Sequence, residues 1–173
     1  MDGFLEPLKR KEIEMKNSKI LMLGAGGAAR AIIAGFHKEN AKKITIVNRT
    51  KSKGDELATF SNELGLSSIS KSIEDMNNFD SEFDIVVNAS SLGLKDEKNI
   101  IPSRLFDERT TVYDIVYKPI KTDLINIAKE RKSRIIFGYE MLLGQAIRSF
   151  EIWLDKQAPY EAMKRSILGG FGR

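Results

Sequence analysis

The chain has 173 residues, enough for one domain of ordinary size with a hydrophobic core. It has 42% hydrophobic and 30% charged residues, and its net charge of +4 is spread along the sequence, which argues against a nucleic-acid-binding protein. The absence of cysteine excludes disulfides and thiolate chemistry, and a single histidine argues against a histidine-based metal site or catalytic triad. No apolar run is long enough to span a bilayer, and no secretory signal precedes residue 20, so we expect a cytoplasmic protein without membrane contact.

A glycine-rich turn joins the first expected strand to the first long helix. Residues 19–23 form an apolar run without alternation, as expected of a parallel strand covered on both faces. Gly24-Ala25-Gly26-Gly27-Ala28-Ala29 follows, and apolar residues then recur at helical spacing. This G-x-G-x-x-A pattern allows a tight turn and a close approach of the backbone to a pyrophosphate at the start of the helix. It predicts a dinucleotide site; the alternative is a glycine turn that serves packing alone.

The residues after the second expected strand favour NADP over NAD. Residues 43–47 are β-rich and are followed by Asn48, Arg49, Thr50 and, two residues later, Lys53. NAD-binding proteins usually carry a carboxylate here for the ribose 2′-hydroxyl, but this stretch has no acidic residue. An arginine can instead bind a 2′-phosphate through a two-pronged, charge-assisted contact. Alternatively, Arg49 and Lys53 are solvated charges at a helix start, where they oppose the helix dipole.

Strands and helices alternate along the rest of the chain. Strands are expected at residues 66–70, 83–87, 111–116 and 134–137, helices at 51–64, 122–131, 139–154 and 160–167, and a helical turn at 73–76. Residues 168–173 are expected to fray. This alternation predicts an α/β fold, Rossmann-like and doubly wound, with a mostly parallel sheet and helices on both faces. Residues 1–17 would form a leading helix, and residues 18–173 a nucleotide-binding domain with C-terminal helices.

Five segments leave the carboxyl ends of the expected strands, where ligands bind in such sheets. Each carries polar residues or glycine where a plain connector needs few. The segments are residues 24–27, 48–53, 88–93, 114–122 and 138–145. We expect them to converge on one site.

Together these segments resemble the nucleotide-binding half of the shikimate dehydrogenase family. The resemblance rests on the glycine loop up to Arg30, on Asn48-Arg49-Thr50-x-x-Lys53, on Asn88-Ala89-Ser90-Ser91-x-Gly93, on Asp114-x-x-Tyr117-x-Pro119-x-x-Thr122 and on Gly138-x-x-Met141-Leu142-x-x-Gln145. Leu94 stands where the family often has methionine, a change that conserves size. The order and spacing of these motifs hold over nearly the whole chain.

The resemblance implies NADP as the cofactor and assigns residues to it. Met141 would pack near the nicotinamide, although Met141 and Leu142 are alternatively core residues at helical spacing. The residues expected to bind the cofactor are Gly24, Ala25, Gly26, Gly27, Ala28, Asn48, Arg49, Thr50, Lys53, Asn88, Ala89, Ser90, Ile115, Gly138 and Met141.

The resemblance also implies that part of the family's chain is absent here. The family's full chain starts with a substrate domain of about a hundred residues. That domain carries serines that bind the substrate carboxylate and a lysine that acts on the reacting hydroxyl. Met1-Asp2-Gly3 is similar to the end of the family's Asn-Thr-Asp-Gly motif, which makes Asp2 the expected catalytic partner of that lysine. The alternative is that Asp2 is frayed and silent at the chain end.

The implied reaction is reversible hydride transfer between NADPH and the carbonyl of 3-dehydroshikimate, giving shikimate. Tyr117 and Gln145 would hydrogen-bond this small-molecule substrate, which the absent N-terminal domain would share. Tyr117 is alternatively a packed loop residue. The isolated chain is expected to bind NADP weakly and to catalyse little.

Other functions follow from the same residues. A non-catalytic module that binds NADP fits an intact glycine loop without the proton-donating lysine. A methyltransferase also has a glycine-rich first turn, but its second strand normally ends in an acid, unlike Asn48 and Arg49 here. Within the oxidoreductases, quinate is an alternative substrate. The sequence makes no prediction of oligomeric state.

Overall fold

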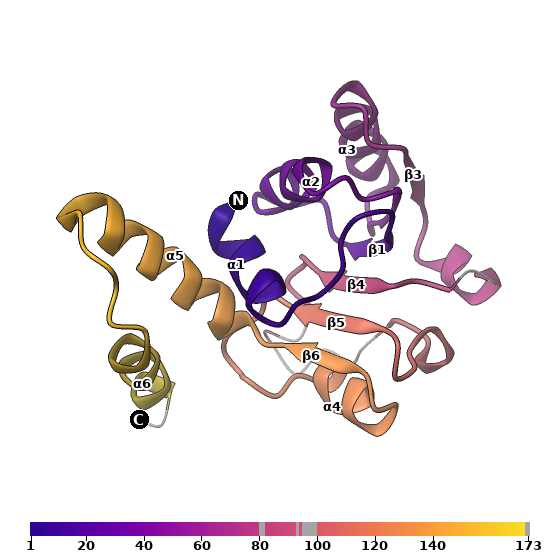
Figure 1. Ribbon diagram of the computed structural model, residues 1–173. Coiled ribbons are helices and arrows are strands. Elements are labelled where there is room, and N and C mark those ends of the chain that lie inside the picture. The colour runs from indigo at the N-terminus through magenta and orange to yellow at the C-terminus, as the bar shows by residue number, and fades with distance from the viewer. Residues whose placement is uncertain (80–81, 93, 95–99, 172–173) are drawn as a thin grey trace.

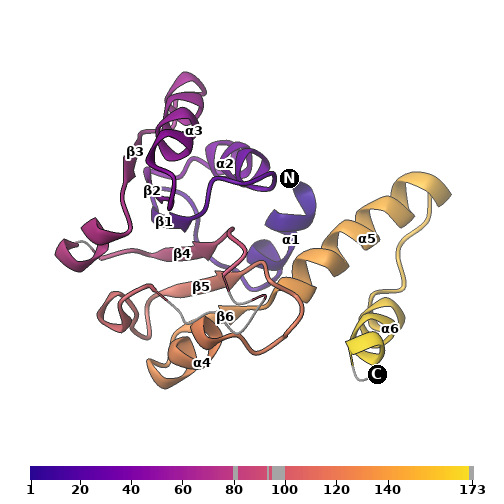
Figure 2. The same ribbon diagram turned by 180° about the vertical axis from the view of Figure 1, so that it is seen from behind.

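The computed structural model describes residues 1–79, 82–92, 94 and 100–171. A six-stranded sheet carries helices on both faces (Figure 1, and from behind in Figure 2). The strands are β1 (Lys19–Leu23), β2 (Lys43–Val47), β3 (Ser68–Lys71), β4 (Ile85–Asn88), β5 (Thr111–Asp114) and β6 (Arg134–Ile136). The helices are α1 (Asp2–Arg10), α2 (Ala29–Lys38), α3 (Lys51–Glu63), α4 (Asp123–Glu130), α5 (Gly138–Leu154) and α6 (Tyr160–Phe171), with short 3-10 helices η1 (Glu74–Asn78) and η2 (Ser103–Leu105).

The sheet is parallel throughout, in the order β3-β2-β1-β4-β5-β6. The strand order reverses beside β1, because β2 lies on one side of it and β4 on the other. Leu23 at the end of β1 is level with both Val47 and Asn88, and Asn88 is level with Asp114. The loops that follow these strands therefore leave the sheet at one edge. This arrangement confirms the predicted Rossmann-like fold.

Two apolar layers hold the helices on the sheet, and β1 supplies both. Ile20 and Met22 lie in the cluster that receives α1, α2 and α3, and Leu21 and Leu23 lie in the cluster that receives η1, η2 and α4. Because side chains alternate between the faces of a strand, an uninterrupted apolar strand is the sequence that can be covered twice. This explains why the apolar run of β1 shows no alternation with polar residues.

The leading helix, α1, is shorter than predicted and packs into the cluster that contains Ile20 and Met22. It ends at Arg10 and not near residue 17. Its Phe4 ring stacks on the buried Tyr113 of β5 at a centroid distance of 4.7 Å. Gly3 lies against α5, since a Cβ added there would come within 2.4 Å of the Gln145 side chain. The expected division at residues 17 and 18 stays a prediction.

At the other end of the chain, α5 extends well beyond the sheet and α6 lies beside its far part (Figure 1). Trp153, near the end of α5, is 81% exposed. The Arg10 guanidinium lies 3.9 Å from the centre of the Tyr160 ring and so connects α1 with the start of α6. The prediction that residues 168–173 fray was wrong for residues 168–171, because α6 continues through Gly169 and Gly170 to Phe171, and residues 172–173 lie outside the described residues.

The remaining expected elements are present with small shifts of their bounds, and η2 was not predicted. Gly65, which follows the C-terminal end of α3, has a positive φ of +93°, the conformation that commonly ends a helix. In the part of the chain that the structure describes, no helix is long and apolar enough to cross a bilayer.

Candidate functional site

A pocket of about 530 Å³ lies where the strand order reverses. Its walls are the loops after β1, β2 and β4, completed by Ile73 and Ile100. The lining residues from these loops are Leu23, Gly24, Ala25, Gly26, Val47, Asn48, Arg49, Thr50, Lys53, Ala89, Ser90, Ser91 and Leu92. Three of the five predicted segments therefore converge on one pocket, at the position where doubly wound sheets bind ligands. Gly93, part of the third segment in the sequence motif, lies outside the described residues.

The turn after β1 requires glycine at its first position. Gly24 has φ +105°, a conformation that residues with a side chain rarely adopt. A Cβ added there would also come within 2.8 Å of the backbone of Ala89 and Ser90. Around Gly26 and Gly27, in contrast, the space within 4 Å of an added Cβ is open. The first glycine thus brings two loops together, and the next two leave room for a ligand.

The helices that begin at this pocket have no side-chain cap. Neither Ala28, before α2, nor Thr50, before α3, accepts a capping hydrogen bond through its side chain. Elsewhere, Thr122 caps α4 by accepting from the Ile125 amide, and Glu140 reaches back from α5 to the Phe137 amide at 3.0 Å. Free N–H groups and the positive end of a helix dipole favour an anion. The pocket therefore offers two helix starts to a phosphorylated ligand.

The pocket has a positive charge that no carboxylate of its lining neutralises. Arg49 and Lys53 are exposed, and among the described residues neither has a hydrogen bond or ion pair. The neighbouring Lys51 is instead paired with Asp55. Asn48 donates from Nδ2 to the Thr50 carbonyl at 2.8 Å, which shapes the turn that presents Arg49. Such a site suits an anionic group such as a phosphate.

Residues 88–92, here called the Asn88 loop, are held by the Asn88 side chain. Its Nδ2 donates to the Leu92 carbonyl and to Asp114 Oδ1, both at 2.9 Å. Its Oδ1 accepts from the Ser90 amide at 3.1 Å and from Ser90 Oγ at 2.6 Å. These four contacts use the hydrogen-bonding capacity of the amide. Asn88 thus holds the loop without lining the pocket, whereas Ala89, Ser90, Ser91 and Leu92 line it.

The fourth and fifth segments meet each other beside this pocket and do not line it. Gly138 is packed between strand ends, since a Cβ added there would come within 2.4 Å of the Val116 carbonyl oxygen and 2.6 Å of that of Ile115. Tyr117 is 49% exposed. Met141 packs against the core cluster of α1 and β1, as expected from the core interpretation of its helical spacing.

The remaining predicted site residues lie at the packing of α1 on α5. Asp2 and Gln145 are exposed, and Gly3 of α1 contacts Gln145 of α5. Asp2 also lines a pocket of about 430 Å³ between the two helices. Asp2, Tyr117 and Gln145 are therefore surface residues on the loop side of the sheet and outside the basic pocket. Gly27, Ala28, Ile115 and Met141 are likewise not part of the lining of that pocket.

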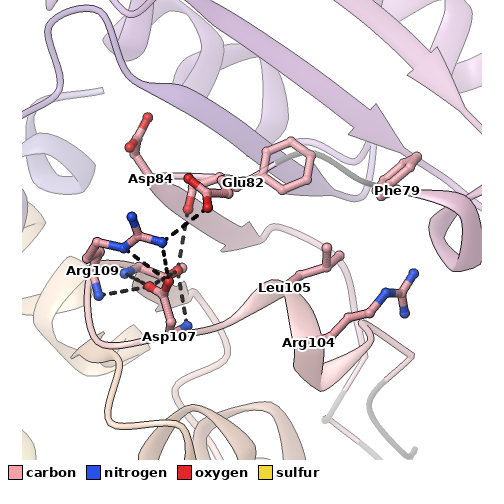
Figure 3. Close-up of a pocket in the computed structure, with 9 residues that line it drawn as sticks. Phe79, Glu82, Asp84, Arg104, Leu105, Asp107 and Arg109 are labelled. Atoms are coloured by element: carbon pink, nitrogen blue, oxygen red, sulfur yellow. Dashed lines mark hydrogen bonds and ion pairs between the residues drawn. The ribbon is translucent and has the colours of Figure 1, made fainter.

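A third pocket, of about 370 Å³, lies at the opposite, amino-terminal edge of β4 and β5 (Figure 3). Its charges are used within the protein. Arg109 pairs with Asp107 and Glu82, and Arg104 donates to the carbonyls of Met76 and Asn77. Unlike Arg49 and Lys53 in the basic pocket, both of these arginines have partners within the protein, and we assign this surface a structural role.

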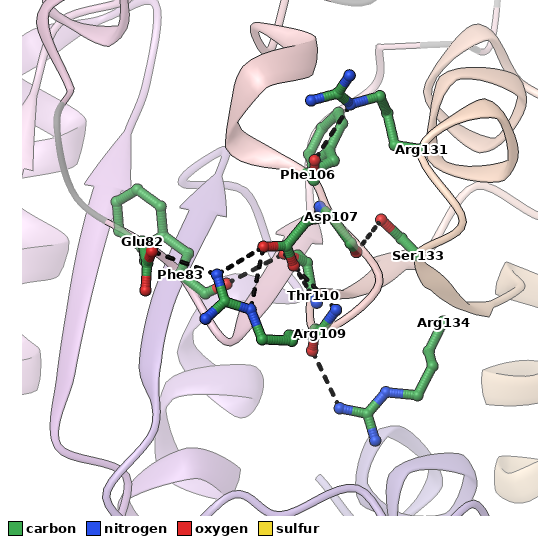
Figure 4. A network of polar contacts seen from close by, with 9 residues as sticks. All are labelled: Glu82, Phe83, Phe106, Asp107, Arg109, Thr110, Arg131, Ser133 and Arg134. Carbon is green, nitrogen blue, oxygen red and sulfur yellow. Dashed lines mark hydrogen bonds and ion pairs between the residues drawn. The ribbon is translucent and has the colours of Figure 1, made fainter.

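Asp107 is the centre of the polar network at that edge (Figure 4). Its carboxylate accepts from the Arg109 side chain and amide and from the Thr110 amide and hydroxyl. These contacts, above all the Arg109 side chain, lower the pKa of Asp107 to about 2. The turn before β5 is thereby fixed.

The sequence motifs included Asp114 and Thr122, but no role was predicted for either residue. Asp114 is fully buried at the end of β5, and burial raises the pKa of its carboxyl. Its Oδ2 accepts from Thr122 Oγ1 at 2.5 Å and its Oδ1 from the Val116 amide at 3.1 Å. The signal in the sequence was an aspartate directly after apolar strand residues, the usual place for a polar group at a strand end.

The strand order, the glycine turn and the pocket at the reversal point define a doubly wound α/β domain of the Rossmann class. Comparison with known families makes the assignment specific. The family model described as shikimate/quinate 5-dehydrogenase matches residues 7–112, and the model of the shikimate 5′-dehydrogenase C-terminal domain matches residues 138–168. The chain belongs to the shikimate/quinate 5-dehydrogenase family.

Individual relatives agree with this assignment. The shikimate dehydrogenase (NADP(+)) of Nitrosopumilus maritimus is 54% identical over 99% of this chain and 63% of its own length. The crystal structure of shikimate 5-dehydrogenase from Listeria monocytogenes, in complex with shikimate and NAD, has a TM-score of 0.87 at 29% identity, over 95% of this chain and 61% of that one. The Thermus thermophilus enzyme in complex with NADP(H) and shikimate has a TM-score of 0.77 at 29% identity, over 95% and 59%. This chain thus spans about three fifths of the length of these relatives.

Proposed function

We propose that this chain binds NADP(H) and forms the nucleotide-binding part of an NADP-dependent shikimate dehydrogenase. The observation that carries the proposal is the basic pocket at the reversal point, where Arg49 and Lys53 have no acidic neighbour in the lining. An NAD site normally needs a carboxylate at this position, and a 2′-phosphate would be repelled by one. The Nitrosopumilus relative is named as an NADP(+) enzyme, which supports the same cofactor.

Different residues of the pocket would bind different parts of the cofactor. The turn at Gly24–Gly27 and the start of α2 would take the pyrophosphate, and Arg49, Thr50 and Lys53 the 2′-phosphate. Ala89 and Ser90 would approach the nicotinamide side, held there by Asn88. NADPH, when bound, supplies the hydride.

The substrate side is proposed from the family resemblance. Tyr117 and Gln145 would hydrogen-bond hydroxyls of 3-dehydroshikimate, and Asp2 would orient a proton-donating lysine from the part of the relatives that this chain does not span. The three residues are exposed, as binding of a further chain segment and a substrate requires. Quinate instead of shikimate and a purely NADP-binding role are the alternatives. A cytoplasmic location stays a prediction.

Calorimetric titration of the chain with NADP⁺ and with NAD⁺ tests the cofactor. We expect tighter binding of NADP⁺, and Arg49→Ala should weaken it by roughly 10- to 150-fold, the range of a charge-assisted contact, while affecting NAD⁺ much less. Arg165→Ala, an exposed arginine of α6, is the matched control and should leave both affinities unchanged. Equal effects of Arg49→Ala on both cofactors would contradict the proposed clamp.

A second measurement concerns catalysis. With NADP⁺ and shikimate, the chain alone should turn over far below the usual range of about 1–10³ s⁻¹, because it lacks the proposed proton donor. Turnover within that range would show that the 173 residues contain a complete active site, and would contradict this part of the proposal.

A further inference from the structure

Asp114 is a fully buried carboxylate that has no cationic partner among the described residues. A buried charge is expensive unless hydrogen bonds compensate it. Three donors do so here: the Asn88 amide, the Val116 backbone and the Thr122 hydroxyl. They belong to three different pieces of the chain, namely the end of β4, the segment after β5 and the start of α4. One side chain thus ties these pieces together.

The contact with Asn88 determines which way the Asn88 amide points. A carboxylate oxygen can only accept, so it selects the NH₂ end of the amide and leaves Oδ1 for the amide and hydroxyl of Ser90. Ser90 Oγ in turn accepts from the Leu92 amide at 3.1 Å. The conformation of the Asn88 loop therefore follows from the position of an acceptor on the neighbouring strand.

The same carboxylate also fixes the segment that carries Tyr117. Its Oδ1 holds the Val116 amide directly before Tyr117, and its Oδ2 holds Thr122, which caps α4. We propose that Asp114 is a positioning residue that orients the Asn88 loop of the nucleotide pocket through Asn88 and links this loop to the segment with Tyr117. The consequence for cofactor binding rests on the NADP site proposed above.

The first test measures the loop itself and needs no cofactor. In the full chain, Asp114→Ala should speed amide hydrogen exchange at Ser90 and Leu92, whereas Asp114→Asn, which keeps an acceptor oxygen, should preserve it. The matched control is Ser61→Ala in α3. It removes the hydroxyl of another fully buried side chain, which bonds to the Leu66 carbonyl and to the Ser68 hydroxyl at the start of β3. Unchanged exchange at Ser90 and Leu92 in Asp114→Ala would overturn the proposal.

The second test measures NADP⁺ affinity by calorimetry. Asp114→Ala should weaken binding by about tenfold or more, the scale of one buried hydrogen bond, and Asp114→Asn should largely restore it. Because Asp114 acts through Asn88, the double variant with Asn88→Ala should bind no worse than Asn88→Ala alone. Ser61→Ala should bind like the wild type. Additive losses in the double variant would show that Asp114 does not act through Asn88.

Two further outcomes are informative. If Asp114→Ala does not fold, Asp114→Ser replaces it, since serine can still cap the Val116 amide but is too short to reach Asn88. It should show the same faster exchange at Ser90 and Leu92, and wild-type exchange there would refute the proposal. If the wild-type chain does not bind NADP⁺, the proposed function fails, while the exchange experiment still decides the role of Asp114.

Discussion

Gly24 and Ala89 approach so closely that a single added carbon would not fit between them. A Cβ at Gly24 would lie 2.8 Å from the carbonyl carbon and oxygen of Ala89. The two residues directly follow the neighbouring strands β1 and β4, and the Ala89 amide donates to the Leu23 carbonyl at 2.8 Å. The wall of the pocket is therefore built from two loops whose backbones are in direct contact, and this contact can be tested separately from binding.

Gly24→Ala should destabilise the fold by roughly 2–4 kcal/mol, since it combines an unfavourable positive φ with a backbone clash. Gly26→Ala is the control, because an added Cβ meets nothing within 4 Å there. It should unfold like the wild type in urea but bind NADP⁺ more weakly, as Gly26 lines the pocket. Equal stability of the Gly24→Ala variant and the wild type would contradict the close contact.

Thr122→Val should lower the free energy of unfolding by about 2 kcal/mol. It removes the cap of α4, which accepts from the Ile125 amide, and it leaves Asp114 Oδ2 buried without its donor. Thr122→Ser keeps the hydroxyl and should cost much less. Urea denaturation of both variants checks this, and equal losses would mean that the methyl group of Thr122 stabilises the fold as much as its hydroxyl does.

Asp107 should make the protein sensitive to acid. Because contacts with Arg109 and Thr110 lower its pKa from 3.8 to about 2, its stabilising contribution is present above the unfolded-state pKa and is lost as the pH falls from about 4 to about 2. Asp107→Asn should therefore reduce the change in urea midpoint across this interval. Glu161→Gln, an exposed residue of α6, is the control and should leave the change as in the wild type. If Asp107→Asn showed the same change in urea midpoint as the wild type, Asp107 would not be the source of the acid sensitivity.

Trp153 should report on the far end of α5. It is the only tryptophan of the chain and is 81% exposed. Its fluorescence should have the emission maximum of indole in water and be quenched readily by iodide, and Trp153→Ala should change stability by less than about 0.5 kcal/mol. Emission typical of a buried indole, with weak quenching, would show that this end of α5 is covered in solution, for example by a second copy.

The sequence predicted the parts of the site that follow from local patterns. The glycine turn, the basic residues after β2 and the polar loop after β4 each stand directly behind an apolar strand, and parallel strands bring such loops to one edge. The network around Asp114 could not be predicted in this way. It depends on the pairing of Asn88 with Asp114 in neighbouring strands, a register that residues 26 positions apart do not disclose.

The other outcomes have equally local causes. Asn88 was expected to bind the cofactor because it stands in the loop motif; this role stays a prediction, and the structure shows that its side-chain amide already bonds to Ser90, Leu92 and Asp114. Fraying was expected from residue 168 because glycine disfavours helices, yet α6 continues through Gly169 and Gly170. The core position of Met141 was an open alternative, since helical spacing alone does not distinguish a core face from a cofactor face.

The central place of β1 has a consequence for how the molecule is made. β1 pairs with β2 as soon as residue 47 is available, but its other edge stays open until β4 at residues 85–88 exists. During synthesis, β1, β2 and β3 therefore appear before β4, and the edge of β1 that pairs with β4 is still open. Parallel sheets fold slowly, and an open strand edge is prone to aggregate. The Ala89 wall of the pocket is made only after the glycine turn and the loop after β2. Nascent chains that stop before β4 should depend on chaperones, whereas chains that include it can pair both edges of β1.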